Sequence, residues 1–252
     1  SIMKERFGAT KAKAQMLRFH VHTAGSVLTA QQDDNNIIRI AWQAMSAILG
    51  GTQSLALCAK DEAESIPTRE SATLALRTQQ LLAFESGIAD TIDPLGGSYY
   101  VEALTDQIER EAREYIHKID EMGGAVAAIE QGYMQQEMAT HAFEYEQEIE
   151  SGKRTVIGVN KYVIEDEEHH TQLLQVDPAV GDRQMAKLKK LKETRDNAAV
   201  EKALANVRKV ARSEENIMPC LIEAVKTYAT LGEICGVLRE EFGEYHQDHP
   251  AF

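Results

Sequence analysis

The sequence predicts an α/β protein that begins with strand, helix and strand and continues into a long helical part. Apolar and polar residues alternate over residues 16–23, which is typical of a half-buried strand. Apolar residues recur at helical spacing over residues 36–49, and a second short apolar run follows at 52–58. Strand, helix and strand in this order form a βαβ unit, whose two strands run parallel.

The first strand has one apolar and one polar face, because successive side chains point to opposite sides. Leu17, Phe19 and Val21 alternate with Arg18, His20 and His22. A polar face on a strand flanked by helices usually lines a site. Residues 23–26, which include Gly25, break the strand.

The helix over residues 36–49 has recognisable ends. Asp33 or Asp34 supplies the chemistry of an N-cap, and Gly50 and Gly51 end the helix because glycine adopts the left-handed conformation without steric cost. The helix carries an apolar stripe, so we expect it to pack against the sheet.

An acidic loop with Asp61, Glu62 and Glu64 follows the second strand. Loops at the carboxyl ends of parallel strands build the site in α/β proteins, which favours a functional interpretation. The alternative for Asp61 and Glu64 is a solvated loop that caps the next helix. That helix is expected from Thr68 to Glu85, with Ser86-Gly87 closing it.

The rest of the chain is predicted to be mainly helical, apart from a third short strand at 88–92 and an extended segment at 153–164. The expected helices cover residues 101–122, 124–130, 135–150, 177–192, 195–212, 217–229 and 231–242. The first 15 residues form at most a frayed helical turn. A change in composition places a boundary after residue 152, which gives two parts, 1–152 and 153–252.

Composition excludes several classes of protein. The chain has 252 residues, 27% charged residues and a net charge of −13, which argues against binding to a nucleic-acid backbone. Three scattered cysteines do not suit a disulfide framework or a thiolate metal site and fit a reducing, cytoplasmic compartment. No apolar run has transmembrane length. The abrupt, charged start suggests the C-terminal portion of a longer protein.

Short motifs leave the chemistry open. His20 and His22 form an HxH pair that could bind a metal in a barrel-type hydrolase, but the other histidines lie far along the chain and no neighbouring strand offers further ligands. We therefore expect no protein metal site. No glycine-rich phosphate loop, nucleophile elbow or Cys/His pair stands out.

Longer blocks of sequence carry a resemblance to a known family. They are LRFHVHTAGSVLTAQQDDNNIIRIAWQAMSAILGGTQSL, DEAESIPT, ALRTQQLLAFESG, DPLGGSYYVEALTDQIE and VIGVNKY. Together they resemble the carboxyl-terminal half of the large, catalytic subunit of the methylmalonyl-CoA mutase family. The resemblance implies the C-terminal part of a (β/α)8 TIM barrel followed by a mainly helical tail.

The resemblance also implies an isomerase that uses adenosylcobalamin. In this family a deoxyadenosyl radical removes a substrate hydrogen, the thioester group of an acyl-CoA migrates, and the hydrogen returns. The cofactor carries the difficult chemistry, and the protein orients and shields it.

Six positions match the family's cofactor contacts. Gly25 resembles the place where the backbone approaches the corrin ring, and Glu62 with Ala63 resembles the residues that hold the ribose of the adenosyl group. Ile66 fits an apolar contact just beyond. His20 and His22 would lie at the cavity below the corrin, although the family commonly has Gln where this chain has His22.

A second departure lies next to the site. The family has His-Thr-Asn where this chain has Ala56-Leu57-Cys58, so three polar groups near the cofactor are lost. The residues that recognise the acyl group and transfer protons are expected upstream of residue 1. The substrate could therefore be methylmalonyl-CoA, isobutyryl-CoA, 2-hydroxyisobutyryl-CoA or another branched acyl-CoA.

The resemblance finally implies a partner. The family's cobalamin-binding domain carries an Asp-x-His-x-x-Gly motif, and nothing after Tyr162 matches it; His249 directly follows Asp248. We therefore expect a separate small cobalamin-binding subunit and a hetero-oligomer. Two alternatives stay open, a metal-dependent hydrolase that uses His20 and His22, and a non-catalytic assembly protein on the mutase fold.

Overall fold

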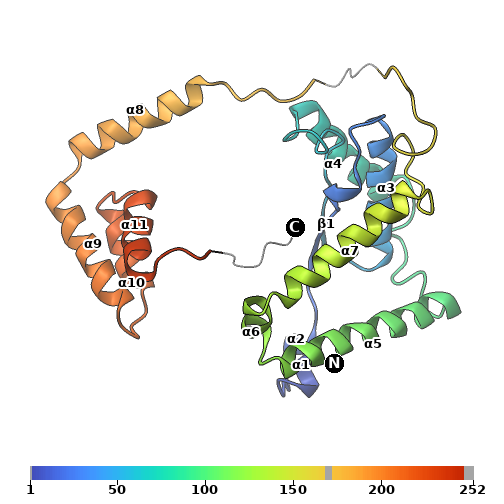
Figure 1. The fold of residues 1–252 in the computed structure, drawn as a ribbon, viewed down its shortest axis with the longest axis horizontal. Coiled ribbons are helices and arrows are strands. Elements are labelled where there is room, and N and C mark those ends of the chain that lie inside the picture. Colours follow the sequence, from blue (N-terminus) through green and yellow to red (C-terminus); the bar gives the residue numbers. More distant parts are fainter. Residues whose placement is uncertain (1, 168–171, 247–252) are drawn as a thin grey trace. The chain divides into compact units, whose positions relative to one another are not determined.

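A computed structural model describes residues 2–167 and 172–246, a mostly helical chain with a small parallel sheet (Figure 1). It divides into two compact units, the first reaching from the N-terminus to Leu174 and the second beginning at Gln175. His249, named above, and two further histidines, His169 and His170, lie outside the described residues.

The predicted βαβ unit is present in the first unit. Strand β1 (His20–His22) pairs in parallel with β2 (Ser54–Ala56), and helix α3 (Asn35–Leu49) connects them. His20 lies opposite Ser54 and His22 opposite Ala56. Each strand has only three residues, so both are shorter than the alternation of the sequence predicts.

Helix α3 turns its apolar stripe inward. Ile40 and Ala44 are buried, and Ile40 packs with Leu28 and Cys58 in a small core. The chain leaves the helix through Gly51, whose φ of +76° lies in the left-handed region, as predicted. Asp34 occupies the N-cap position but makes no capping bond with its side chain.

Helix α4 (Arg69–Phe84) contacts α3 and begins as predicted. The backbone N–H of Ser71 donates to the Thr68 hydroxyl, which is the expected N-cap bond. Asp61 Oδ2 in turn accepts from both the backbone N–H and the hydroxyl of Thr68, each at 3.0 Å. The acidic loop is thus tied to the start of α4.

The third strand predicted at 88–92 is wrong. These residues form turns and bends that begin at Gly87, whose φ is +69° and whose carbonyl accepts from the N–H of Asp90. Ile92 is 98% exposed, so no neighbouring strand covers it in the described part of the chain. Residues 88–92 include Asp90 and Thr91, and so short a run of mixed polarity cannot by itself distinguish a strand from a loop.

Helices make up most of the remainder of the first unit. They are α1 (Ile2–Glu5), α2 (Ala12–Gln15), the 3-10 turn η1 (Gly25–Val27), α5 (Tyr99–Glu121), α6 (Ala125–Glu130) and α7 (Tyr133–Glu150). The segment predicted as extended over 153–164 contains a single bridge between Ile157 and Lys161. Arg39 of α3 donates to the carbonyl of Ile157, so this segment is held against the βαβ unit.

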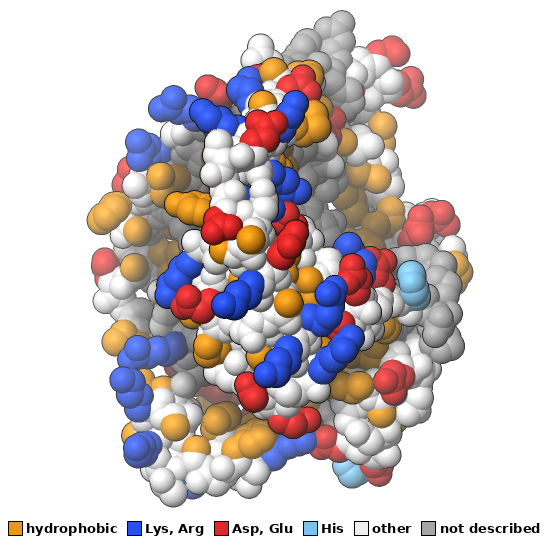
Figure 2. All heavy atoms as spheres, turned by 90° about the vertical axis from the view of Figure 1, so that its left-hand side faces the viewer, with side chains coloured by type: hydrophobic (Ala, Val, Ile, Leu, Met, Phe, Trp, Pro, Cys, Tyr) orange, Lys and Arg blue, Asp and Glu red, His pale blue; other side chains and the backbone are white. Residues whose placement is uncertain are grey.

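The second unit is helical, as predicted. It contains α8 (Ala179–Thr194), α9 (Asn197–Ala211), α10 (Met218–Lys226) and α11 (Leu231–Phe242). α10 and α11 both contact α9 around a core that includes Val200, Val207, Ala224 and Val237. Basic and acidic side chains are interspersed on the face drawn in Figure 2.

The division into compact units falls after Leu174, so residues 153–167 lie in the first unit. The domain boundary that the composition places after residue 152 stays a prediction. None of the helices described is long and apolar enough to cross a membrane.

Candidate cofactor site

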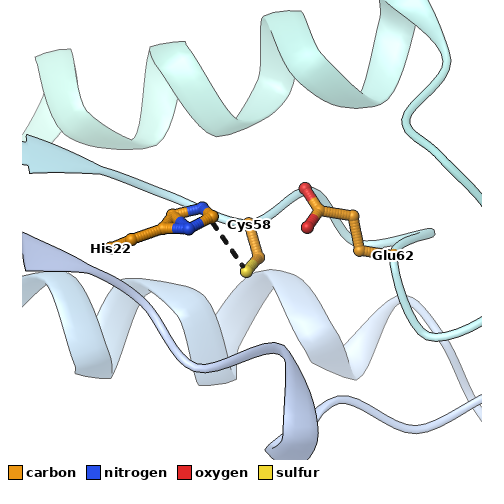
Figure 3. A group of neighbouring side chains, drawn as sticks. All are labelled: His22, Cys58 and Glu62. Carbon is orange, nitrogen blue, oxygen red and sulfur yellow. Dashed lines mark hydrogen bonds between the residues drawn. The ribbon is translucent and has the colours of Figure 1, made fainter. Parts of the chain in front are cut away.

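The carboxyl ends of β1 and β2 bring three side chains together (Figure 3). His22 is the last residue of β1, Cys58 lies two residues after β2, and Glu62 belongs to the turn that follows. A ring nitrogen of His22, the Sγ of Cys58 and a carboxylate oxygen of Glu62 all lie within 4.8 Å of one another. This edge is where a site is expected in a parallel α/β protein.

Cys58 is the fixed member of this group. Its side chain is buried, its backbone N–H donates to the Thr23 hydroxyl at 2.8 Å, and its thiol donates to the Thr23 carbonyl at 3.1 Å. His22 Nε2 lies 3.8 Å from the sulfur. Burial, with a smaller contribution from the nearby Glu62 carboxylate, raises the pKa of the Cys58 thiol above its ordinary value.

The raised pKa of the Cys58 thiol argues against a role as a catalytic nucleophile. A nucleophilic cysteine needs a thiolate at neutral pH, which requires a lowered pKa. The Cys58 thiol instead keeps its proton and donates it to a carbonyl. The Cys58 and His22 pair is therefore not arranged as an activated nucleophile with its base.

Glu62 is half-buried and held by its own turn. Its Oε1 accepts a hydrogen bond of 2.6 Å from the backbone N–H of Ala59, and its carboxylate points toward Cys58 (Figure 3). A carboxylate oriented by a backbone donor is a suitable acceptor for hydroxyl groups of a ligand.

The neighbouring acidic residues of the loop have other roles. Asp61 is 1% exposed and bonds Thr68, which is the capping role considered as the alternative, although the side chain is buried rather than solvated. Its other carboxylate oxygen is buried without a hydrogen-bond partner among the described residues. Glu64 is exposed.

The HxH pair does not form a joint metal site. His20 and His22 share the exposed face of β1, but His20 Nδ1 lies 2.8 Å from the Ser54 hydroxyl, whereas His22 faces Cys58. Among the described residues, the group of possible ligands contains His22 and not His20. The hydrolase interpretation built on both histidines thus finds no support in this geometry.

Gly25 lies beside this edge in a conformation that does not require glycine. Its φ is outside the left-handed region, and an added Cβ would meet only Cys58 Sγ, at 3.7 Å, an ordinary contact. Nothing in the described chain therefore requires a glycine here. Ala63 and Ile66 lie on the loop of Glu62 and are exposed, Ile66 by 58%.

Two features escaped the sequence analysis. The first is the Cys58 and His22 pair, which could have been found because parallel strands meet at their carboxyl ends. The second is a buried polar bridge centred on Asn36, which is fully buried. Its amide donates to the carbonyls of Thr29 and Lys60 and accepts from the Thr29 N–H and from Arg39.

Asn36 therefore joins the loop after Gly25 to the loop before Glu62. These two loops carry most of the residues predicted to contact the cofactor. No short sequence motif signals such a bridge, because an Asn near a helix N-terminus usually serves as a cap.

Comparison with known protein families identifies the family to which the sequence is related. The family described as methylmalonyl-CoA mutase matches residues 1–244. This chain belongs to the methylmalonyl-CoA mutase family. Family membership agrees with the resemblance drawn from the sequence blocks.

Curated relatives in the methylmalonyl-CoA mutase family match over nearly the whole chain. The large subunit of 2-hydroxyisobutanoyl-CoA mutase from Aquincola tertiaricarbonis is 43% identical over 252 residues, which is all of this chain and 45% of the relative. Methylmalonyl-CoA mutase from Escherichia coli K12 is 44% identical over 241 residues, 95% of this chain and 34% of the relative.

The human mitochondrial methylmalonyl-CoA mutase is 39% identical over 245 residues, 97% of this chain and 33% of the relative. The chain thus spans less than half the length of these relatives.

Proposed function

We propose that this chain forms the C-terminal part of the large subunit of an adenosylcobalamin-dependent acyl-CoA mutase. In this proposal β1, β2 and the helices around them complete a (β/α)8 barrel, and the second unit is the helical tail. The reaction is the carbon-skeleton rearrangement of a branched acyl-CoA. Relatives of similar identity are named for two different substrates, so the proposal extends to the class and not to one acyl-CoA.

The observation that carries the proposal is the meeting of Gly25, His22 and Glu62 at the carboxyl edge of the two parallel strands. Gly25 leaves open the space that a side chain would fill, although a Cβ would fit there without a clash with the described chain. A flat ligand such as a corrin can approach the backbone closely only where no side chain obstructs it.

Each residue then has a defined task. Glu62, oriented by the Ala59 N–H, would accept hydrogen bonds from the vicinal hydroxyls of the ribose. Ala63 would help to hold the ribose, and Ile66 would make an apolar contact just beyond it. His20 and His22, on the exposed face of β1, would line the cavity below the corrin.

When bound, the cofactor supplies the radical chemistry that these side chains lack. The protein residues bind and orient it and exclude water. We place the acid, base and acyl-group contacts upstream of residue 1.

Gel filtration with spectrophotometric detection tests the proposal. The complete large subunit and its small subunit are mixed with adenosylcobalamin and separated from free cofactor. We expect a corrin spectrum that remains with the protein. A protein fraction without corrin absorbance, together with zinc-dependent hydrolase activity, would contradict the proposal.

A further inference from the structure

The three donor atoms at the carboxyl edge of β1 and β2 differ in kind: an imidazole nitrogen, a thiol sulfur and a carboxylate oxygen. This set suits Zn²⁺, which accepts nitrogen, sulfur and oxygen ligands, and does not suit Mg²⁺ or Ca²⁺, which take oxygen ligands. We propose that His22, Cys58 and Glu62 form a site for a zinc-like divalent metal ion.

Distances support this proposal. Zinc bonds of about 2.0 to 2.3 Å at tetrahedral angles separate neighbouring ligand atoms by roughly 3.3 to 3.6 Å. His22 Nε2 and Cys58 Sγ are 3.8 Å apart, close to that value. The three donors lie within 4.8 Å of one another, so closing the site needs a shift of roughly 1 Å.

The backbone holds the site in advance. Thr23 directly follows His22, and its hydroxyl accepts from the backbone N–H of Cys58, so the two ligands from different strands are fixed to each other. The bond from the Cys58 thiol to the Thr23 carbonyl is given up when metal binding removes the thiol proton. The Ala59 N–H orients the Glu62 carboxylate. Such outer contacts to metal ligands fix their orientation and strengthen binding.

Two of the three ligands come from separate strands of the sheet: His22 ends β1 and Cys58 follows β2. These two positions lie 36 residues apart in the sequence and are in contact in the structure. An imidazole and a thiolate are both strong ligands for zinc.

Three protein ligands leave one tetrahedral position open, as in zinc sites that also bind water or a small anion. Binding releases the thiol proton of Cys58 to solvent, because the thiolate is the ligand. The metal and the adenosyl group would share Glu62, so the test uses cofactor-free protein.

Cobalt(II) serves as the spectroscopic probe for this site. The untagged protein that carries this chain is stripped with a chelator and titrated with Co²⁺ alone. We expect one equivalent to bind, with a thiolate-to-cobalt charge-transfer band and the strong visible bands of four-coordinate Co²⁺, and Zn²⁺ to displace it. The readout does not involve turnover, so its outcome is independent of the proposed function.

Matched variants identify the ligands. Cys58→Ser should abolish the charge-transfer band, and His22→Gln should weaken binding at least about tenfold, since even outer contacts are worth 10- to 100-fold. Cys235→Ser, at an exposed cysteine, and His20→Gln should leave binding unchanged.

His22 lies on an exposed face, so its variant keeps the test valid if Cys58→Ser does not fold. Unsaturable cobalt binding, or binding that His22→Gln leaves unchanged, would overturn the proposal.

Discussion

At the scale of single residues, Glu62 is the most direct test of the cofactor site. Its side chain is half-buried and Oε1 already accepts from Ala59, a contact that Gln can keep. Glu62→Gln therefore preserves the turn but removes the charge that strengthens hydrogen bonds to ribose hydroxyls. We expect turnover to fall roughly ten- to a hundredfold, about 1.4 to 2.7 kcal/mol.

The matched control is Glu64→Gln, in the same loop but exposed. It should leave steady-state kinetics of the assembled enzyme unchanged. Equal kinetics for the Glu62 variant and the wild type would return Glu62 to the role of a loop residue without a ligand.

A substitution at Gly25 should affect cofactor binding without affecting the stability of the fold. An added Cβ meets only the Cys58 sulfur, at an ordinary distance of 3.7 Å, so Gly25→Ala should not lower the thermal midpoint. If the corrin ring lies against this backbone, the same methyl group should weaken cofactor binding by about tenfold or more, about 1.4 kcal/mol. Binding equal to that of the wild type would remove Gly25 from the site.

At the scale of elements, the start of α3 holds the two site loops together through Asn36. Asn36→Ala would leave partly buried backbone groups of Thr29 and Lys60 without these partners, and a fully buried group left unpaired costs about 1 to 3 kcal/mol. We expect a total loss of about 2 to 4 kcal/mol, seen as a lower urea midpoint.

Asn35→Ala is the matched control for Asn36→Ala, because Asn35 is the preceding residue of α3 and is less buried. Within the described part of the chain, its side-chain amide donates only to the side chain of Gln32. Its effect should stay below about 1 kcal/mol. Similar losses in both variants would mean that the bridge made by Asn36 adds nothing beyond an ordinary helix start.

In the second unit, Glu233 joins the beginnings of α9 and α11. It completes a capping box with Thr230, and its carboxylate accepts two hydrogen bonds from Arg195. The Arg195 guanidinium holds the pKa of Glu233 far below its ordinary value. A lowered pKa stabilises the fold above the unfolded value of about 4.3, and this stabilisation is lost as the pH falls further.

Glu233→Gln should therefore lower the thermal midpoint of the second unit at pH 7, and the difference from the wild type should shrink below about pH 4. Glu223→Gln, whose exposed carboxylate pairs with Lys226, should have little effect at either pH. A difference that stays constant from pH 7 to pH 3 would show that the ionised carboxylate is not what stabilises the unit.

At the scale of the whole molecule, the sequence predicted helices better than contacts. α3, α4 and α11 begin and end close to their predicted residues because each combines an apolar stripe with a cap. The strand at 88–92 was misassigned because five residues that include Asp90 and Thr91 are too few to show a clear period. The pairing of His22 with Cys58 depends on strand register, which a single sequence does not fix.

Assembly is the last property that can be tested at this scale. The 43% identical relative is named a large subunit, and the proposed function assigns this chain to a large subunit that works with a separate small one. The proposed site supplies Gly25, Glu62 and two histidines for one part of the cofactor. In this proposal the Asp-x-His-x-x-Gly motif that binds cobalt lies on the small subunit.

We therefore expect the full-length large subunit alone to lose adenosylcobalamin on gel filtration. Adding the small subunit should retain the cofactor and raise affinity by at least about a hundredfold, 2.7 kcal/mol, because contacts from both polypeptides then act together. Glu62→Gln in the same mixture should weaken retention without preventing the two subunits from co-eluting. Stable binding and turnover by the large subunit without any second polypeptide would rule out the proposed division of the site.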